Sequence, residues 1–134
     1  MNRDINDEIL EHLMHPKNYG TIQDPHGVGV AHSPKSGEFV ITYIKLDNSN
    51  ISEITYATNG CQDTVILGSM FSEMIKGESV EYAQNSSDKM LEKITDATQR
   101  ACAEMVIKSF RASLQLQQSE PFVVEIDEEC VINE

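Results

Sequence analysis

The chain has 134 residues, a length that suits one domain with a modest hydrophobic core. Its 22 acidic and 10 basic residues give a net charge of −12, which would repel nucleic acid and anionic membrane surfaces and attract cations or basic protein surfaces. No apolar run is long enough to cross a membrane, and the first residues do not read as a secretory signal. Three cysteines in such a chain favour free thiols in a reducing compartment, so we expect a cytoplasmic protein.

The first half of the chain predicts one helix and three strands. Apolar residues at helical spacing predict a helix from Asp4 to Met14, which Pro16 ends. Short runs rich in β-branched and aromatic residues predict strands at Val28–His32, Phe39–Leu46 and Ile51–Thr58. A polar turn joins the last two strands, so we expect a sheet of three antiparallel strands.

The second half of the chain predicts helices. After Gly60 the apolar period changes from two to 3.6, and Gly77 stands where a helix C-cap is expected. Ser79 and Ser87 are suited to be N-caps of two short helices, and a long helix is expected from about Asp96 to about Leu114. The apolar residues expected to line the first of these helices are Val65, Ile66, Leu67, Met70, Phe71, Met74 and Ile75.

The C-terminal residues differ in character from the rest. We therefore assign residues 1–116 to one domain and residues 117–134 to an acidic tail or an edge strand, with Phe122–Ile126 as the candidate strand. Cys130 lies beside Glu128 and Glu129, whose negative charge is expected to raise the pKa of its thiol.

Two cysteines are the best candidates for chemistry. Cys61 follows a glycine turn and precedes a helix, and a helix N-terminus favours the thiolate form that binds metals or attacks sulfur. Cys102 lies within the long predicted helix. The alternative for each is a small, buried apolar residue, because free cysteine is among the most buried residue types.

In the spacing of its cysteines and the motifs around them, the chain resembles the NifU amino-terminal domain family, which includes the IscU scaffolds of iron–sulfur cluster assembly. The resemblance covers about residues 5 to 114. It implies an α+β fold, with a three-stranded antiparallel sheet packed against helices and metal ligands at one solvent-facing end. The matching motifs are His12…Pro16-x-Asn18-x-Gly20, the Gly37 turn, Gly60-Cys61, Lys76-Gly77-x-Ser79 and the helix of Cys102.

Three positions depart from the family pattern. Ser36 stands where the family has Cys; a hydroxyl is a hard, weak iron ligand, so Ser36 is either a ligand or only a turn residue. Glu38 replaces Asp and keeps a carboxylate, which is either an iron or zinc ligand or a solvated acid. Ala101 replaces a ligating His, for which His32 is a candidate substitute, whereas His12 is expected to pack or form hydrogen bonds.

The resemblance implies a scaffold or carrier rather than an enzyme. It would receive sulfur from a cysteine desulfurase, bind iron, and pass a transient [2Fe-2S] cluster to acceptor apo-proteins. Cofactor contacts would come from Cys61, Cys102, Glu38 and Ser36, and metal ligands from Cys61, Cys102 and Glu38, with zinc as another possible metal. One alternative is a degenerate binding module, with a single Zn²⁺ or Fe²⁺ or no metal, that docks on a desulfurase or acceptor. A third alternative, a thiol enzyme that uses Cys61 with a His as its base, has less support, because no His lies at a suitable spacing from Cys61.

The resemblance also bears on partners. The IscU branch offers a Leu-Pro-Pro-Val-Lys stretch to a dedicated chaperone, but the corresponding segment here, Leu91–Asp96, contains no proline, which makes that interaction doubtful. We expect a monomer or a weak homo-oligomer, with no nucleic-acid or membrane partner.

Overall fold

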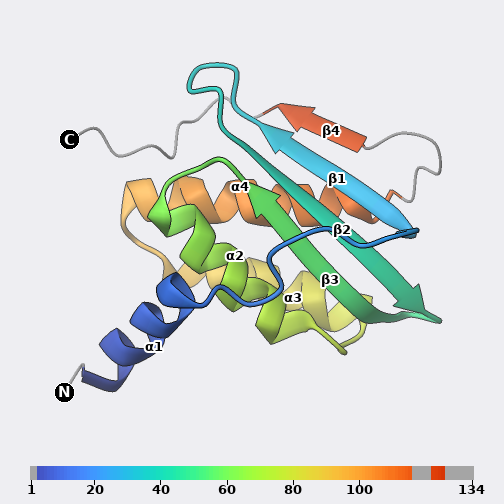
Figure 1. Ribbon diagram of the computed structural model, residues 1–134, viewed down its shortest axis with the longest axis horizontal. Coiled ribbons are helices and arrows are strands. Elements are labelled where there is room, and N and C mark those ends of the chain that lie inside the picture. The colour runs from blue at the N-terminus through green and yellow to red at the C-terminus, as the bar shows by residue number, and fades with distance from the viewer. Residues whose placement is uncertain (1–2, 116–121, 126–134) are drawn as a thin grey trace.

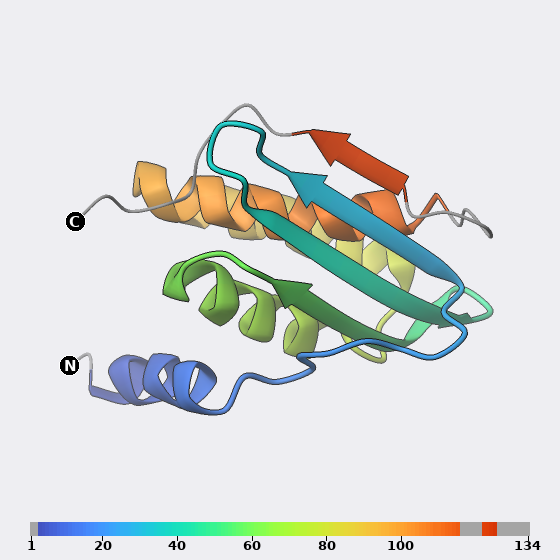
Figure 2. The same cartoon turned by 45° about the horizontal axis from the view of Figure 1, so that its top comes forward.

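A computed structural model of the chain describes residues 3–115 and 122–125, and the side chains within 9–115 and 123–125. Four helices and four strands occur in this part of the chain, and the expected α+β class is confirmed. Helices α2 and α4 pack against one face of the sheet, α3 packs against both of them, and α1 packs against α2 (Figures 1 and 2). The elements are α1 (Arg3–Met14), β1 (Gly27–His32), β2 (Phe39–Asp47), β3 (Asn50–Thr58), α2 (Gln62–Ile75), α3 (Val80–Lys93), α4 (Ala97–Ser113) and β4 (Phe122–Glu125).

The sheet has four strands in the order β3-β2-β1-β4, one more than the three expected. Strands β1, β2 and β3 pair antiparallel as predicted, with a register shift between Lys45 and Leu46 where β2 meets β3. The fourth strand is the edge strand considered for the C-terminal residues. It pairs parallel to β1, with His32 opposite Glu125. The last residue of the predicted strand, Ile126, lies outside the described residues.

The core lies between the sheet and the helices. Side chains of β2 alternate as predicted, because Val40, Thr42 and Ile44 are buried while their neighbours are partly exposed. The larger apolar cluster includes Phe71 of α2 and Phe110 of α4, whose rings meet edge to face with centroids 5.4 Å apart. A smaller cluster lies under the other end of the sheet and contains the buried residues Ala31, Val40, Ala101, Cys102 and Met105.

Residues 80–93 form one helix rather than the two predicted. Ser79 is the N-cap that the sequence indicates, since its hydroxyl oxygen accepts a hydrogen bond of 3.0 Å from the Tyr82 amide. Ser87 is not a cap. Its hydroxyl donates to the Ala83 carbonyl one turn earlier, at 2.8 Å, so the helix continues through it.

The buried face of α2 also differs from the prediction. Thr64, Gly68, Ser69 and Ser72 are buried there with Phe71 and Ile75, whereas Val65, Ile66 and Met70 are only half-buried and Met74 is exposed. This face of α2 has small residues because the ring of Tyr56 packs closely against it: a Cβ at Gly68 would lie 2.6 Å from that ring.

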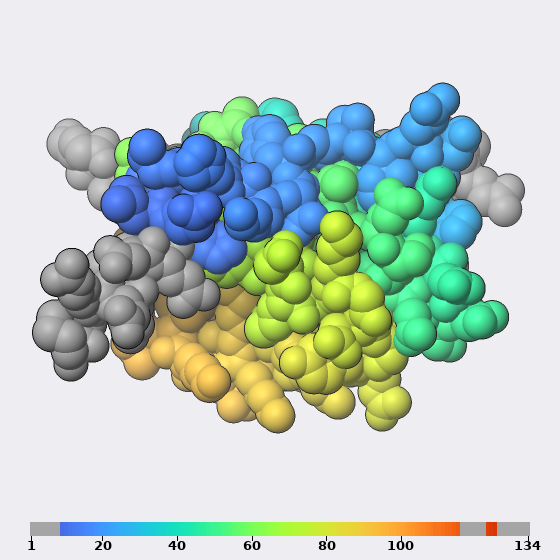
Figure 3. Space-filling view, turned by 60° about the horizontal axis from the view of Figure 1, so that its bottom comes forward, coloured from blue at the N-terminus to red at the C-terminus, as the bar shows by residue number. Residues whose placement is uncertain are grey.

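The N-terminal segment covers another part of α2. His12 forms a buried 2.5 Å hydrogen bond between its Nδ1 and Ser69 Oγ, in agreement with the hydrogen-bonding role expected for it. Figure 3 shows the N-terminal residues in blue beside the yellow-green residues of the helical face. Within the parts of the chain that the structure describes, no helix is both long and apolar enough to span a membrane.

Candidate functional site

The candidate site lies at one end of the sheet, where the β1–β2 loop meets the turn between β3 and α2. Antiparallel pairing places both connections at this end. The Asn59 side chain joins them: its Oδ1 accepts from the Phe39 amide at 2.8 Å, and its Nδ2 donates to the Gly37 carbonyl at 3.2 Å. Thr58 adds a third link, because its hydroxyl donates to the Phe39 carbonyl at 2.6 Å. The relative position of the two loops is therefore defined by direct hydrogen bonds.

Cys61 is the N-cap residue of α2 and is half-buried. Its carbonyl oxygen accepts hydrogen bonds from the amides of Thr64 and Val65, which begin the helix. The exposed N–H groups and partial positive charge of a helix N-terminus favour an anion at this position. The structure thus places Cys61 where the sequence predicts it, at the start of a helix.

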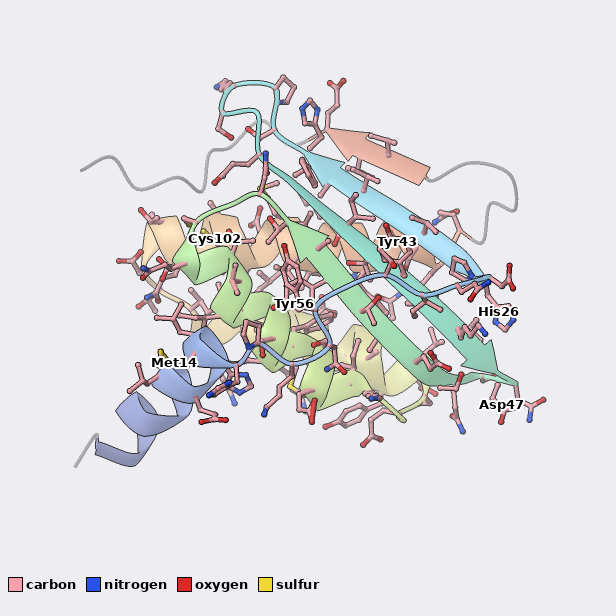
Figure 4. All side chains as sticks on the ribbon, viewed as in Figure 1. Met14, His26, Tyr43, Asp47, Tyr56 and Cys102 are labelled. Atoms are coloured by element: carbon pink, nitrogen blue, oxygen red, sulfur yellow. The ribbon has the colours of Figure 1, made fainter. Side chains whose placement is uncertain are left out.

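Cys102 is fully buried in α4 and faces Cys61. The two sulfur atoms lie 3.8 Å apart, although the residues are 41 positions apart in sequence. Figure 4 shows Cys102 on α4 where that helix passes behind the beginning of α2. Because Cys102 is the sixth residue of α4, it lies beyond the first turn, where the helix dipole has most of its effect. The two thiols are therefore neighbours, but only that of Cys61 lies where a helix N-terminus favours the negatively charged thiolate.

Glu38 and Ser36 belong to the loop over this pair. The Glu38 side chain is buried, and one carboxylate oxygen lies 3.3 Å from where a Cβ at Gly60 would be, so the carboxylate lies over the residue before Cys61. The Ser36 hydroxyl oxygen accepts a 3.2 Å hydrogen bond from the Glu38 amide, and Gly37 between them has a φ of +80°. Ser36 therefore has a turn-forming contact in this conformation.

The donor set fits a thiophilic metal only in part. Two thiolates are soft ligands of the kind that iron and zinc accept, and a carboxylate is close by. Yet within residues 3–115 and 122–125 no three His, Cys, Asp or Glu side chains are grouped closely enough to hold a metal ion. Ala101 contributes only apolar packing beside Cys102, and His32 joins no such group within this part of the chain. The ligand roles of Cys61, Cys102, Glu38 and Ser36 stay predictions.

Two residues at the site were not singled out by the sequence analysis. Thr64 is fully buried, and its hydroxyl lies 3.8 Å from the Cys61 sulfur. Its position three residues after an N-cap is the available signal, because the third helical residue faces the cap. Asn59 is the other, and nothing in the sequence indicates that its side-chain amide bridges to the Gly37 loop.

The fold and the thiol pair define a class of small α+β domains that present cysteines at one end of a sheet covered by helices. Residues 4–119 match the model of the NifU-like N terminal domain, so the chain belongs to that family. The resemblance drawn from the cysteine spacing is thereby confirmed.

Similar proteins are named as scaffolds. The chain is 33% identical over 91 residues to the iron-sulfur cluster assembly scaffold protein IscU of Aquifex aeolicus, covering 66% of this chain and 58% of that protein. It is 36% identical over 77 residues to IscU 1 of Archaeoglobus fulgidus, covering 58% of this chain and 50% of that one. The chain thus spans little more than half the length of these relatives.

Solved structures agree on the fold. One is a putative iron-sulfur cluster assembly scaffold protein for the SUF system from Fervidobacterium islandicum, with a TM-score of 0.65 at 20% identity, covering 81% of this chain and 94% of that one. Another is the N-terminal part of a nitrogen-fixing NifU-like protein from Brucella abortus, with a TM-score of 0.65 at 15% identity, covering 86% and 94%.

Proposed function

We propose that this protein is a scaffold on which an iron–sulfur cluster is assembled and from which it is transferred. The observation that carries the proposal is the 3.8 Å approach of the Cys61 and Cys102 sulfurs, beneath a loop that brings the Glu38 carboxylate to the same end of the sheet. Family membership and the names of the relatives support the same role. The cluster is the cargo of this protein, and a carrier does not turn over a small substrate.

Sulfur enters first in this proposal, from the persulfide of a cysteine desulfurase. The thiolate of Cys61 attacks the terminal sulfur of that persulfide, the S–S bond breaks, and the desulfurase cysteine leaves as a thiolate. Cys61 is the better acceptor of the two because it is half-exposed at a helix N-terminus, whereas Cys102 is buried.

Iron is held by Cys61, Cys102 and Glu38, and a [2Fe-2S] cluster passes to an acceptor apo-protein. A set of two thiolates and one carboxylate is weaker than a four-thiolate site, so the cluster should be labile, as transfer requires. The net charge of −12 favours desulfurase and acceptor surfaces that are basic. We further propose a cytoplasmic monomer or weak homo-oligomer.

No chaperone partner is included in this proposal. The segment Leu91–Asp96 runs from the last turn of α3 to the N-cap of α4 and contains no proline. The Leu91 carbonyl already accepts a hydrogen bond from the Arg100 guanidinium.

The second candidate is a degenerate binding module that docks on a desulfurase or acceptor and carries one metal ion or none. Ser36 and Ala101 favour it, since both replace ligands of the family pattern. So does the lack of any group of three potential ligands in the described part of the chain.

Anaerobic reconstitution distinguishes the two. The reduced protein is incubated with ferrous iron, cysteine and a cysteine desulfurase, and the visible spectrum, iron content and acid-labile sulfide are measured. The scaffold proposal requires a chromophore with bound sulfide that Cys61→Ser and Cys102→Ser each remove while the far-UV circular dichroism stays unchanged. No chromophore and no sulfide would establish the binding module instead. Unchanged stability of a zinc-loaded sample on chelation would remove the metal as well.

A further inference from the structure

A hollow of about 640 Å³ lies between helices α1, α2 and α3 and shares no residue with the thiol site. Residues of α2 and α3 form its two walls, and His12 of α1 borders it, held by its hydrogen bond to Ser69. Figure 3 views the face on which the blue residues of α1, the yellow-green end of α2 and the yellow to gold residues of α3 meet.

The walls of the hollow are apolar and rich in methionine. Met70 and Met74 lie one turn apart on α2, and Met90 lines the hollow from α3. Met74 is 39% exposed and Tyr82, at the start of α3, is 46% exposed. Large apolar side chains gathered around a hollow mark a binding site, and methionine is the flexible side chain that adapts to the shape of a partner.

The rim of the hollow is positively charged, although the molecule as a whole is acidic. Lys89 and Lys93 lie one turn apart on α3, line the hollow and are exposed. None of the ion pairs within residues 3–115 and 122–125 includes either lysine. Glu73, the acidic residue among the described lining residues, accepts a 3.1 Å hydrogen bond from the Asn18 side chain. The two lysines can therefore pair with an anionic group of a partner.

The shape of the hollow suits a helix. Tyr82 and Lys93 both line it and are 11 residues apart, so it extends for about 17 Å along α3, or three helical turns. Its described walls are helical, and they offer no strand edge with which an extended peptide could pair. An amphipathic helix, in contrast, can lay its apolar face into a groove between two helices.

We infer that this hollow is a docking site for an amphipathic helix of a partner protein. The apolar stripe of that helix lies between α2 and α3, and its acidic residues lie beside Lys89 and Lys93. The net charge of −12 repels an acidic helix from most of the surface, so the two lysines also direct it to this face. The inference goes beyond cluster assembly, because docking requires neither metal nor persulfide at the thiol pair.

Synthetic peptides serve as the probe. The first is a fluorescein-labelled helix of about four turns with a stripe of leucines flanked by glutamates. The second has lysines in place of the glutamates, and the third has the residues of the first in scrambled order. Binding to the full chain is measured by fluorescence anisotropy in about 0.15 M salt, where charges more than about 8 Å apart are largely screened. We expect the first peptide to bind at least about tenfold more tightly than the other two, and equal binding of all three would overturn the inference.

Charge reversal tests the two lysines. Lys89→Glu/Lys93→Glu should weaken binding of the glutamate peptide by about three- to tenfold and strengthen binding of the lysine peptide. The matched control is Lys35→Glu/Lys108→Glu, which changes the net charge equally at exposed residues that do not line the hollow. Circular dichroism checks that both variants are folded. An equal loss in the two variants would attribute binding to net charge and overturn the inference.

The methionine methyl signals in NMR spectra locate the bound helix. Those of Met70, Met74 and Met90 should shift on addition of the glutamate peptide, whereas that of Met105, fully buried in the core, should not. Unchanged signals from the three lining methionines would place the peptide elsewhere and overturn the inference. Decanoate that binds there more tightly than the peptide would assign the hollow to a small amphiphile. Self-association of the chain that Lys89→Glu/Lys93→Glu abolishes would assign it to a second copy, and either result would also overturn the inference.

Discussion

Ser36 and Glu38 lie in the same turn, but their side chains have different surroundings. The Ser36 hydroxyl accepts from the backbone amide of Glu38, a contact within the loop, while the Glu38 side chain is buried above Gly60. At neutral pH a serine hydroxyl stays protonated, whereas a cysteine at the same position would offer a soft, ionisable ligand. If the proposed scaffold function is right, we expect the atom at position 36, oxygen or sulfur, to affect how firmly metal is held.

Replacing Ser36 by Cys should make the reconstituted cluster longer-lived. A third thiolate within the loop would strengthen the proposed ligand set of two thiolates and one carboxylate. The measurement is the decay of the visible chromophore after excess iron is removed. Ser36→Ala is the matched control: it removes the hydrogen bond to the Glu38 amide, costs about 1 kcal/mol in stability, and should leave cluster lifetime no longer than in the parent. Equal lifetimes for the Cys variant and the parent would show that position 36 does not face the cargo.

Strand β1 and helix α4 lie unusually close together, and this contact positions Cys102 relative to the sheet. A Cβ at Gly29 would lie 2.2 Å from the Ser109 carbonyl oxygen and 2.3 Å from the Ser113 amide nitrogen. Next to this contact, the hydroxyls of Thr42 and Ser109 are 2.6 Å apart and hydrogen-bonded. The helix that carries Cys102 therefore rests directly on the backbone of β1.

Gly29→Ala should separate these two elements. The clash is with main-chain atoms, which cannot rotate away, so we expect a loss of about 1–3 kcal/mol or more in the free energy of unfolding. Urea denaturation followed by circular dichroism measures it. Val123→Ala on β4 is the control, since that side chain is 56% exposed and its truncation should change stability by less than about 0.5 kcal/mol. A Gly29→Ala protein as stable as the control would show that β1 and α4 can move apart at little cost.

The elements that the sequence predicts well are those with local signals. The two-residue alternation of β2, the Ser79 cap and the positive φ of Gly77 are properties of short segments, and the structure has them as expected. The N-cap predicted at Ser87 is wrong because a serine hydroxyl can either cap the start of a helix or donate to a carbonyl within one. The residues around Ser87 do not distinguish these two roles.

Features that depend on distant contacts were beyond the sequence. The small buried face of α2 exists because the ring of Tyr56, on β3, fills the space beside Gly68. The sequence offers Phe122–Ile126 as a candidate edge strand, but its parallel pairing with β1 depends on a contact that no local pattern reveals. At the site, the family resemblance identifies Cys61 and Cys102 from their spacing in the sequence. The distance between their sulfurs and the bridging hydrogen bonds of Asn59 become known only from the fold.

The molecule as a whole carries a large negative charge, and metal binding should stabilise it. Metal that binds only the folded state raises the free energy of unfolding by about 2.7 kcal/mol when free metal is 100 times its dissociation constant. We expect Zn²⁺ to raise the melting temperature, with the rise lost in Cys61→Ser and reversed by a chelator. Mg²⁺ is the control for a general effect of counterions, because it prefers oxygen ligands. A similar rise with both ions would attribute the effect to the acidic surface.

Alkaline conditions should destabilise the fold through Tyr56. Burial, and secondly the nearby Tyr19 phenol, raise the pKa of Tyr56 above its ordinary value of 10.0. Below pH 10 both states keep this proton. Above it the unfolded chain releases the proton and the folded chain does not, so stability falls by up to about 1.4 kcal/mol per pH unit.

Urea unfolding at several pH values between 9 and 11 measures this slope, and the parent is compared with Tyr56→Phe. The variant loses the 2.8 Å hydrogen bond to the Val65 carbonyl and should start less stable, but its stability should fall less steeply with pH. If stability fell equally steeply with pH in the two proteins, the raised pKa of Tyr56 would not be the cause of the alkaline destabilisation. The chain has no tryptophan, so absorbance near 295 nm reports tyrosine ionisation directly.

The parallel pairing of β4 with β1 joins segments that are far apart in the sequence, with Phe122 opposite Gly29. Contacts so far apart in sequence form slowly, and the ribosome makes β4 after β1, β2 and β3. The other three strands and all four helices precede it, so the Cys61–Cys102 pair can assemble on the nascent chain before the sheet is closed. The order of synthesis would then complete the thiol pair before β4 is added to the edge of β1.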